Sequence, residues 1–190
     1  MKEKIPAVIF AGGKSSRMGK DKALLPFGDA SSLIHYQYRK LSLIFEEVFL
    51  SAKINRTDPE IPLIADRYDV FSPLSGIVSV FEQIDADEIF VLSVDTPLIK
   101  KDVIQKILDS EAKGDAVIAR NQGKVQPLCG RYRRSILPRI KLALTEDKHK
   151  LGRLLQEADT YYVDFEEDHA FMNLNHPHEY EAALLLLHKL

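Results

Sequence analysis

Residues 5–25 read IPAVIFAGGKSSRMGKDKALL, and the start of this run indicates an α/β fold. Residues 5–11 are apolar throughout, which is typical of a strand buried on both faces of a parallel sheet. Gly12 and Gly13 follow at once, so we expect a loop at the carboxyl end of this strand. The segment therefore predicts a buried strand that delivers a glycine-rich loop to one edge of a sheet.

The rest of the chain alternates between strand and helix patterns. Ser31 or Ser32 can cap the first helix, and Ser135 a later one. Strands are expected over residues 48–52, 61–65, 89–94, 116–119, 125–132 and 161–165. Helices are expected over residues 34–45, 76–84, 103–108 and 151–158, after Ser135 with Pro138 in the first turn, and from near Pro177 onwards. This order predicts one α/β domain over residues 1–190, a mostly parallel sheet with helices on both faces. Such sheets bind ligands at the carboxyl ends of their strands.

Composition restricts the class of protein. The chain has 190 residues with 45% hydrophobic and 28% charged side chains, as globular domains have. Its 26 Lys+Arg and 28 Asp+Glu give a formal charge of −2, which disfavours a nucleic-acid partner. The single cysteine, Cys129, excludes an internal disulfide and favours a reducing, cytoplasmic setting. No apolar run is long enough for a signal peptide or a membrane span, so we expect no membrane partner.

The glycine-rich segment over residues 12–22 carries the densest chemistry. Its three glycines allow a ligand to approach the backbone closely, and its hydroxyl and cationic donors suit a polyphosphate. Five residues separate Gly13 from Gly19, and Asp21 follows Lys20, so the spacing differs from that of the G-x-x-x-x-G-K-[ST] phosphate loop. A glycine-rich surface turn with solvated charges is the alternative.

Residues 11–25 resemble the opening motif of nucleotidyltransferases that join a nucleoside triphosphate to a phosphorylated acceptor. Among these enzymes, the chain is most similar to the molybdenum cofactor guanylyltransferases. Residues 93–98 (SVDTPL) resemble the family's strand-end metal motif, residues 126–128 (QPL) a mid-chain proline motif, and residues 171–175 (FMNLN) the closing motif. The matches follow the family's order, and the closing motif points to the molybdopterin branch.

The resemblance implies a GTP site around the glycine loop. The residues expected to bind GTP are Phe10, Ala11, Gly12, Gly13, Ser15, Lys22, Ser51, Asp66 and Asp95. Lys22 and Arg17 would act in catalysis by offsetting phosphate charge. Asp66 suits guanine because a carboxylate can accept from both N1–H and the 2-amino group. The alternatives are a solvated turn carboxylate beside Arg67 and, for Ser51, a strand end without a functional role.

Asp95 is the expected catalytic metal ligand. It ends an apolar strand, where the ligand cleft of an open sheet lies. Mg²⁺ is the implied cofactor, because it prefers oxygen ligands and commonly takes only one or two carboxylates from the protein. The alternative is that Asp95 caps the helix after Pro97.

Asn173, Asn175 and Gln126 are expected to bind molybdopterin. The two asparagines share a face if their segment is extended. Asn175 has an alternative role as the cap of the last helix, because His176 stands where the family commonly has a threonine. The alternative for Gln126 is that it is an exposed strand residue without a role in binding.

The expected reaction transfers GMP from GTP to the terminal phosphate of molybdopterin, with pyrophosphate as the second product. Proteins that deliver molybdopterin and proteins that mature molybdoenzymes are the implied partners. Two alternatives stay open: a related nucleotidyltransferase that uses CTP or a sugar phosphate, and a nucleotide-binding module without catalysis. Measuring which nucleotide supports turnover would distinguish the first alternative from a guanylyltransferase. Measuring pyrophosphate release would distinguish the second, because a module without catalysis releases none.

Overall fold

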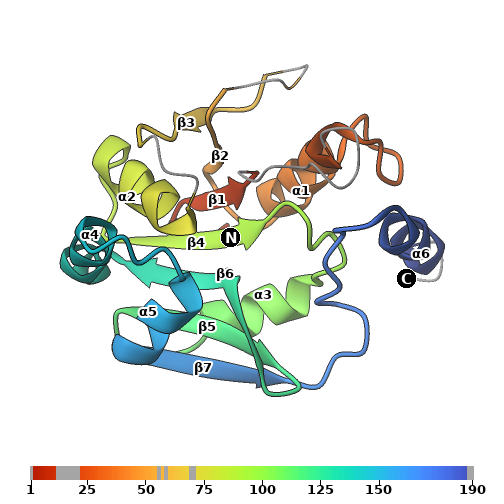
Figure 1. Ribbon diagram of the computed structural model, residues 1–190. Coiled ribbons are helices and arrows are strands. Elements are labelled where there is room, and N and C mark those ends of the chain that lie inside the picture. Colours follow the sequence, from red (N-terminus) through yellow and green to blue (C-terminus); the bar gives the residue numbers. More distant parts are fainter. Residues whose placement is uncertain (1, 12–21, 55–56, 58–59, 69–71, 188–190) are drawn as a thin grey trace.

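A seven-stranded sheet organises the protein (Figure 1). The computed structural model describes residues 2–11, 22–54, 57, 60–68 and 72–187. The strands are β1 (Ala7–Phe10), β2 (Val48–Ala52), β3 (Leu63–Ala65), β4 (Glu88–Ser93), β5 (Ala116–Asn121), β6 (Lys124–Arg133) and β7 (Thr160–Phe165). The helices are α1 (Leu33–Ser42), α2 (Pro73–Gln83), α3 (Lys101–Leu108), α4 (Leu137–Thr145), α5 (Leu151–Glu157) and α6 (Pro177–Leu187), with 3-10 turns η1 (Lys22–Leu24) and η2 (Arg134–Ile136).

The strands lie in the order β3-β2-β1-β4-β6-β5-β7. β1 pairs in parallel with β2 and β4, β2 with β3, and β5 with β7. β6 is antiparallel to both neighbours, and the β5–β6 hairpin turns through positive φ angles at Gln122 (49°) and Gly123 (75°). The mostly parallel sheet is therefore confirmed, with β6 as its one reversed strand in the described chain.

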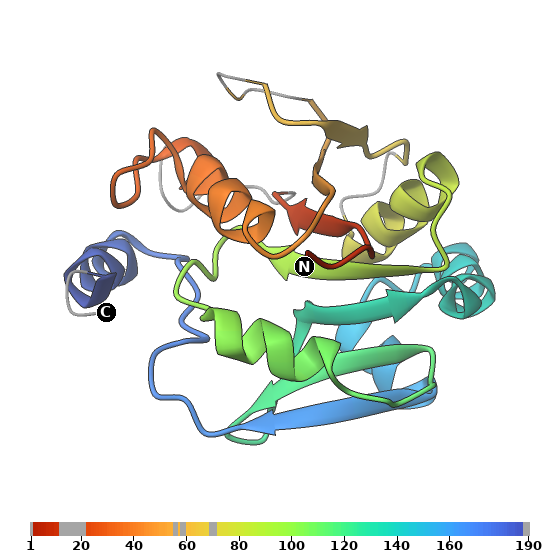
Figure 2. The same cartoon turned by 180° about the vertical axis from the view of Figure 1, so that it is seen from behind.

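Helices cover both faces of the sheet, as expected (Figures 1 and 2). Ala7 and Ile9 of β1 join the cluster that α1 and α3 cover, whereas Val8 and Phe10 join the cluster under α2, α4 and α5. All four side chains are buried. The apolar run of β1 thus supplies both hydrophobic cores, which is why this strand carries no polar side chain.

Only one of the two predicted helix caps is observed. Ser32 caps α1, because its Oγ accepts from the backbone N–H of His35 at 3.2 Å. The expectation for Ser135 is wrong, since its hydroxyl donates to Asp115 at 2.7 Å and α4 begins only after the 3-10 turn η2.

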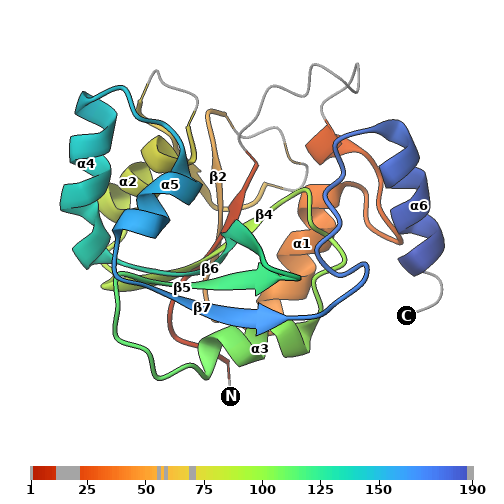
Figure 3. The same cartoon turned by 60° about the horizontal axis from the view of Figure 1, so that its bottom comes forward.

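α6 lies beside α1, at the opposite end of the molecule from α4 (Figure 3). Within the described residues, no helix has the length and apolar character that crossing a bilayer requires.

Candidate active site

The carboxyl ends of β1, β2 and β4 meet at one edge of the sheet. Phe10 is in register with Ser51 on one side and with Ser93 on the other. The Ala11 N–H donates to the Ser51 carbonyl at 3.1 Å, and the Val94 N–H donates to the Phe10 carbonyl at 3.0 Å. Parallel pairing therefore brings the predicted nucleotide residues Phe10, Ala11 and Ser51 to the edge where Asp95 follows β4.

Lys22 is the centre of the contacts at this edge. Its Nζ lies 2.9 Å from Asp95 Oδ2 and 3.1 Å from Asn175 Oδ1. The side chains of Lys22 and Asp95 are 17% and 18% exposed, so the ion pair is largely shielded from water. Ser93 donates its hydroxyl to the other carboxylate oxygen of Asp95. Three sequence motifs far apart in the chain thus converge on one ammonium group.

Asp95 does not cap a helix, and its carboxylate offers the oxygen donors that Mg²⁺ prefers. α3 begins at Lys101, with Lys100 in the cap position and no side-chain cap bond, so Asp95 does not cap it. No group of three or more potential ligands (His, Cys, Asp, Glu) is found among the residues that the structure places. A single carboxylate suits Mg²⁺ that takes its other ligands from phosphates and water.

Asp66 lies directly after β3 and is held by α2. Its carboxylate accepts from the hydroxyls of Ser75 (3.2 Å) and Ser79 (3.1 Å) and from the backbone N–H of Tyr68 (3.1 Å). Asp66 is partly buried, so the carboxylate is held by the fold as well as facing solvent. A carboxylate has about four acceptor positions, so these three bonds leave room for a further donor.

A pocket of about 380 Å³ brings together three of the predicted residues, Asp95, Gln126 and Asn173. Its wall also includes the apolar side chains of Leu128 and Phe171. Cys129 is also among its lining residues, and burial raises the pKa of the Cys129 thiol to about 12, which keeps it protonated. The pocket is therefore lined by apolar side chains together with two amides and a carboxylate.

Lys124 lines the same pocket and was missed by the sequence analysis. It is exposed at the start of β6 and is two positions from Gln126, so the two residues share one face of the strand. That period of two was the signal that could have identified it. Lys124 adds a cation to the side of the pocket that holds the predicted molybdopterin residues.

The closing segment, residues 171–175, contacts the site through its backbone as well as through the side chain of Asn175. The Leu174 N–H donates to the Asp95 carbonyl at 2.9 Å. The backbone N–H groups of Asn175 and His176 both donate to Glu179 Oε2, at 2.6 and 2.8 Å. Glu179 therefore satisfies the start of α6, and the side-chain oxygen of Asn175 accepts from Lys22.

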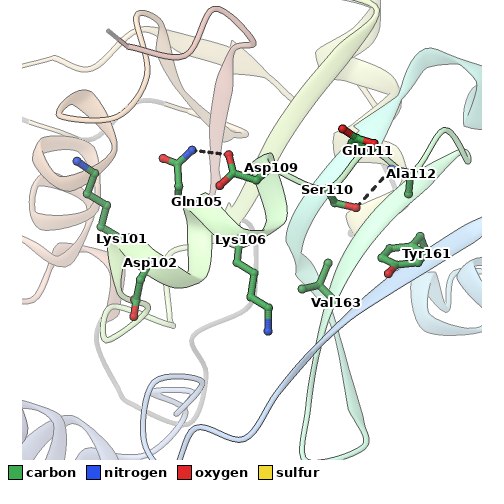
Figure 4. Close-up of a pocket in the computed structure, with 10 residues that line it drawn as sticks. All are labelled: Lys101, Asp102, Gln105, Lys106, Asp109, Ser110, Glu111, Ala112, Tyr161 and Val163. Atoms are coloured by element: carbon green, nitrogen blue, oxygen red, sulfur yellow. Dashed lines mark hydrogen bonds between the residues drawn. The ribbon is translucent and has the colours of Figure 1, made fainter.

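A larger pocket, about 1070 Å³, lies elsewhere, between α3 and β7 (Figure 4). None of the predicted site residues lines it. Two of its polar side chains have partners within the fold, because Gln105 donates to Asp109 at 2.8 Å and Lys106 donates to the Asp164 carbonyl at 3.0 Å. Size alone does not identify the active site of this protein.

Four predicted residues, Gly12, Gly13, Ser15 and Arg17, lie outside the described residues. The contacts given above are therefore those of the strand ends, Lys22, Asp66, Asp95 and residues 171–175. They are enough to show that the first, metal and closing motifs meet at one site.

Residues 7–161 match the family of the MobA-like NTP transferase domain. The chain belongs to this family. The molybdenum cofactor guanylyltransferase of Campylobacter jejuni subsp. jejuni serotype O:6 is 37% identical over 177 residues, which cover 92% of each protein. That of Helicobacter pylori strain G27 is 33% identical over 190 residues, covering 97% of this chain and 94% of the relative. The resemblance drawn from the motifs is thus confirmed.

Solved structures agree on the fold of this MobA-like transferase. Molybdopterin-guanine dinucleotide biosynthesis protein A from Archaeoglobus fulgidus superimposes with a TM-score of 0.82 at 19% identity, covering 98% of this chain and 100% of the other. The 2-C-methyl-D-erythritol 4-phosphate cytidylyltransferase from Thermus thermophilus reaches 0.70 at 14% identity, covering 98% and 100%. Both comparisons show the nucleotidyltransferase fold, and neither selects the base.

Proposed function

We propose that the protein transfers GMP from GTP to the terminal phosphate of molybdopterin, with residues 1–190 acting as one nucleotidyltransferase domain. The products are the molybdopterin guanine dinucleotide and pyrophosphate. The observation that carries the proposal is the contact of Lys22 with both Asp95 and Asn175, because it joins the nucleotide, metal and closing motifs. The full-length similarity to molybdenum cofactor guanylyltransferases supports the choice of substrates.

The reaction needs no protein nucleophile. A phosphate monoester is already anionic near neutral pH, with a second pKa of about 6. Its oxygen attacks the α-phosphorus of GTP, a new P–O bond forms, and the bond to the β-phosphate oxygen breaks as pyrophosphate leaves. Catalysis then rests on alignment and on neutralising the phosphate charge. Lys22 supplies one charge at the described edge, and Arg17 is proposed to supply another.

Asp95 is the residue that would hold Mg²⁺, and Ser93 orients its carboxylate. When bound, Mg²⁺ neutralises the charge on the phosphates and orients them. Lys22 Nζ lies 2.9 Å from Oδ2 of Asp95. We propose that Lys22 turns from this carboxylate to the triphosphate when the nucleotide binds, because the triphosphate carries more negative charge than one carboxylate.

Guanine recognition is assigned to Asp66, with Ser51 and the backbone at Phe10 and Ala11 beside it. The Ser79 hydroxyl and the Tyr68 N–H both donate to Oδ1 of Asp66 and so orient the carboxylate. The Ser75 hydroxyl can donate to the Ser72 carbonyl at 2.7 Å instead of to Oδ2, which would leave the acceptor positions of Oδ2 to guanine. Guanine presents two adjacent donors, N1–H and the 2-amino group, whereas adenine lacks this pair. Gly12, Gly13 and Ser15 are proposed to wrap the phosphates.

The acceptor is assigned to the pocket beside Asp95. Asn173 and Gln126 line it, Lys124 offers a cation to an anionic group, and Asn175 lies at the Lys22 end of the site. Proteins that deliver molybdopterin or receive the dinucleotide are proposed partners.

The test is to incubate the protein with Mg²⁺, molybdopterin and each of GTP, CTP, UTP and ATP, and to follow dinucleotide and pyrophosphate. We expect product with GTP at the highest rate. Equal rates with CTP would contradict guanine recognition, and binding without pyrophosphate release would support a non-catalytic module.

Asp66→Asn sharpens this test, with Asp85→Asn as an exposed control carboxylate on the loop after α2. Loss of one buried polar pair is worth about 1–3 kcal/mol, so the preference for GTP over ATP is expected to fall at least fivefold in Asp66→Asn. The Asp85→Asn control is expected to keep the preference of the native protein.

A further inference from the structure

The segment that carries Asp95 leaves the sheet after β4 and runs without regular structure to the start of α3. Backbone carbonyls in such a segment need partners from elsewhere in the fold. Gln37 and Lys40 of α1 donate hydrogen bonds to the carbonyl of Ser93, which ends β4, and to the carbonyls of Thr96, Pro97 and Ile99. The Ser93 carbonyl also accepts from the Thr96 hydroxyl at 3.1 Å.

Gln37 holds the backbone on both sides of Asp95. Its Nε2 donates to the Ser93 carbonyl at 3.0 Å and to the Thr96 carbonyl at 3.2 Å. The side chain is fully buried, and its Oε1 has no partner among the described residues. Rotating the amide by half a turn would point Oε1 at two carbonyl oxygens, so only one orientation is acceptable. The two N–H donors are therefore what Gln37 contributes.

Lys40 lies one turn further along the same face of α1. Its Nζ donates to the Pro97 carbonyl at 2.8 Å and to the Ile99 carbonyl at 3.0 Å. The side chain is partly buried, and burial lowers the pKa of this amine to about 7. Lys40 thus continues the set of bonds that Gln37 begins, along the part of the segment that leads into α3.

We infer that Gln37 and Lys40 are positioning residues that hold the Asp95 carboxylate at the phosphate and metal site. Gln37 fixes the chain before and after Asp95, and the Leu174 N–H fixes the Asp95 carbonyl itself at 2.9 Å. With its main chain held in this way, Asp95 keeps only its own side-chain rotations. A site whose ligands are fixed in advance loses less freedom when the metal and nucleotide bind. This inference rests on the proposed role of Asp95.

The test measures Mn²⁺, as a spectroscopic substitute for Mg²⁺, bound to the full chain with saturating GTP by electron paramagnetic resonance. Gln37→Met and Lys40→Met keep most of the side-chain volume and remove the donors. We expect each to weaken Mn²⁺ binding about three- to tenfold and to raise the Mg²⁺ concentration needed for half-maximal turnover, with little change in the KM for molybdopterin. Lys40→Arg, which keeps donors, is expected to restore part of the affinity.

Gln83→Met is the matched control. Gln83 is a glutamine of α2 whose Nε2 also bridges two carbonyls, those of Ala65 and Ser79, each at 2.8 Å. We expect Gln83→Met and Gln37→Met both to lower the melting temperature, whereas only Gln37→Met should change the Mn²⁺ affinity.

Melting at lower temperature with native Mn²⁺ affinity in both α1 variants would overturn the inference, since it would show a purely structural role. If Gln37→Met does not fold, Lys40→Met decides, because Lys40 is only partly buried. Native protein that binds no Mn²⁺ with GTP would also overturn it. Native protein that binds Mn²⁺ and GTP but forms no dinucleotide would contradict the proposed function and leave the positioning role supported by the Mn²⁺ titrations.

Discussion

Lys22 Nζ and Asp95 Oδ2 lie 2.9 Å apart although 73 positions separate the two residues in the chain. The pair lies at the edge of the sheet where β1 and β4 end, and both side chains are mostly shielded from solvent. A cation and a carboxylate at this distance neutralise each other, and under the proposed function the nucleotide and the metal would compete for them. Because the two side chains are in contact, we expect substitutions of Lys22 and Asp95 to be coupled in their effects.

Asp95→Asn is expected to reduce the rate of pyrophosphate release by about 100-fold or more with little change in melting temperature. The amide keeps the shape of the side chain but loses the charge that would hold Mg²⁺, and losses of this size are typical when a charge-stabilising group is removed. Steady-state kinetics at saturating Mg²⁺ and GTP provide the measurement. A variant with near-native turnover would remove Asp95 from the catalytic residues.

Lys22→Met is expected to lower kcat/KM for GTP by about 100-fold, because one cation facing the phosphates is lost. The double variant Lys22→Met/Asp95→Asn should be less impaired than the product of the two single effects, since residues in contact are not independent. Lys113→Ala, an exposed lysine between α3 and β5, is the control. Fully multiplicative effects would contradict this coupling.

Asn175 and Glu179 are expected to separate acceptor binding from helix stability. Asn175→Ala should raise the KM for molybdopterin and leave the melting temperature nearly unchanged, because its side chain contacts Lys22. Glu179→Ala should cost about 1 kcal/mol of stability, since two backbone N–H groups at the start of α6 lose their acceptor. Thermal melts paired with molybdopterin titrations check both. If Asn175→Ala instead lowered the melting temperature and left the KM for molybdopterin unchanged, Asn175 would be a helix cap and not an acceptor-binding residue.

Lys124→Ala is expected to raise the KM for molybdopterin about fivefold with kcat nearly unchanged. Lys124 lines the pocket with Gln126 and Asn173 but is exposed, so its attraction for an anion is partly screened. The effect should shrink at high salt. An unchanged KM at low ionic strength would exclude Lys124 from acceptor binding.

Lys40 gives the stability of the protein a defined pH dependence. Burial lowers its pKa to about 7 in the folded protein, whereas an unfolded lysine titrates near pH 10.4. Between these values the unfolded chain holds the extra proton, so the free energy of unfolding rises with pH. Relative to Lys40→Met, the native protein is expected to gain on the order of 1 kcal/mol per pH unit from pH 7.5 to 9.

Urea unfolding of both proteins across this pH range measures the gain. Cys129, whose pKa burial raises to about 12, is present in both, so its titration largely cancels in the difference. A difference that stays constant with pH would mean that Lys40 keeps its charge in the folded state.

Apolar runs were enough to locate the strands and to class the fold. The run at residues 48–52 gave β2 with both of its ends, and the run at 5–11 gave β1 with one core on each face. The reason is local: a strand buried on both faces must be apolar at every position, whatever its neighbours are. Asp95 could be placed for the same reason, since a carboxylate can follow such a strand only at its exposed end.

The tertiary structure alone settled which side chains meet and which caps are used. Asn175 meets Lys22 across 153 positions, and Glu179, rather than Asn175, satisfies the start of α6. Gln37 and Lys40 have the spacing of any helix face, so periodicity gave no sign that they hold the Asp95 segment. A periodic pattern reports which face of an element is buried, but the partner on that face depends on strand order and on the path of distant loops. Those are properties of the whole fold, and no local run of residues encodes them.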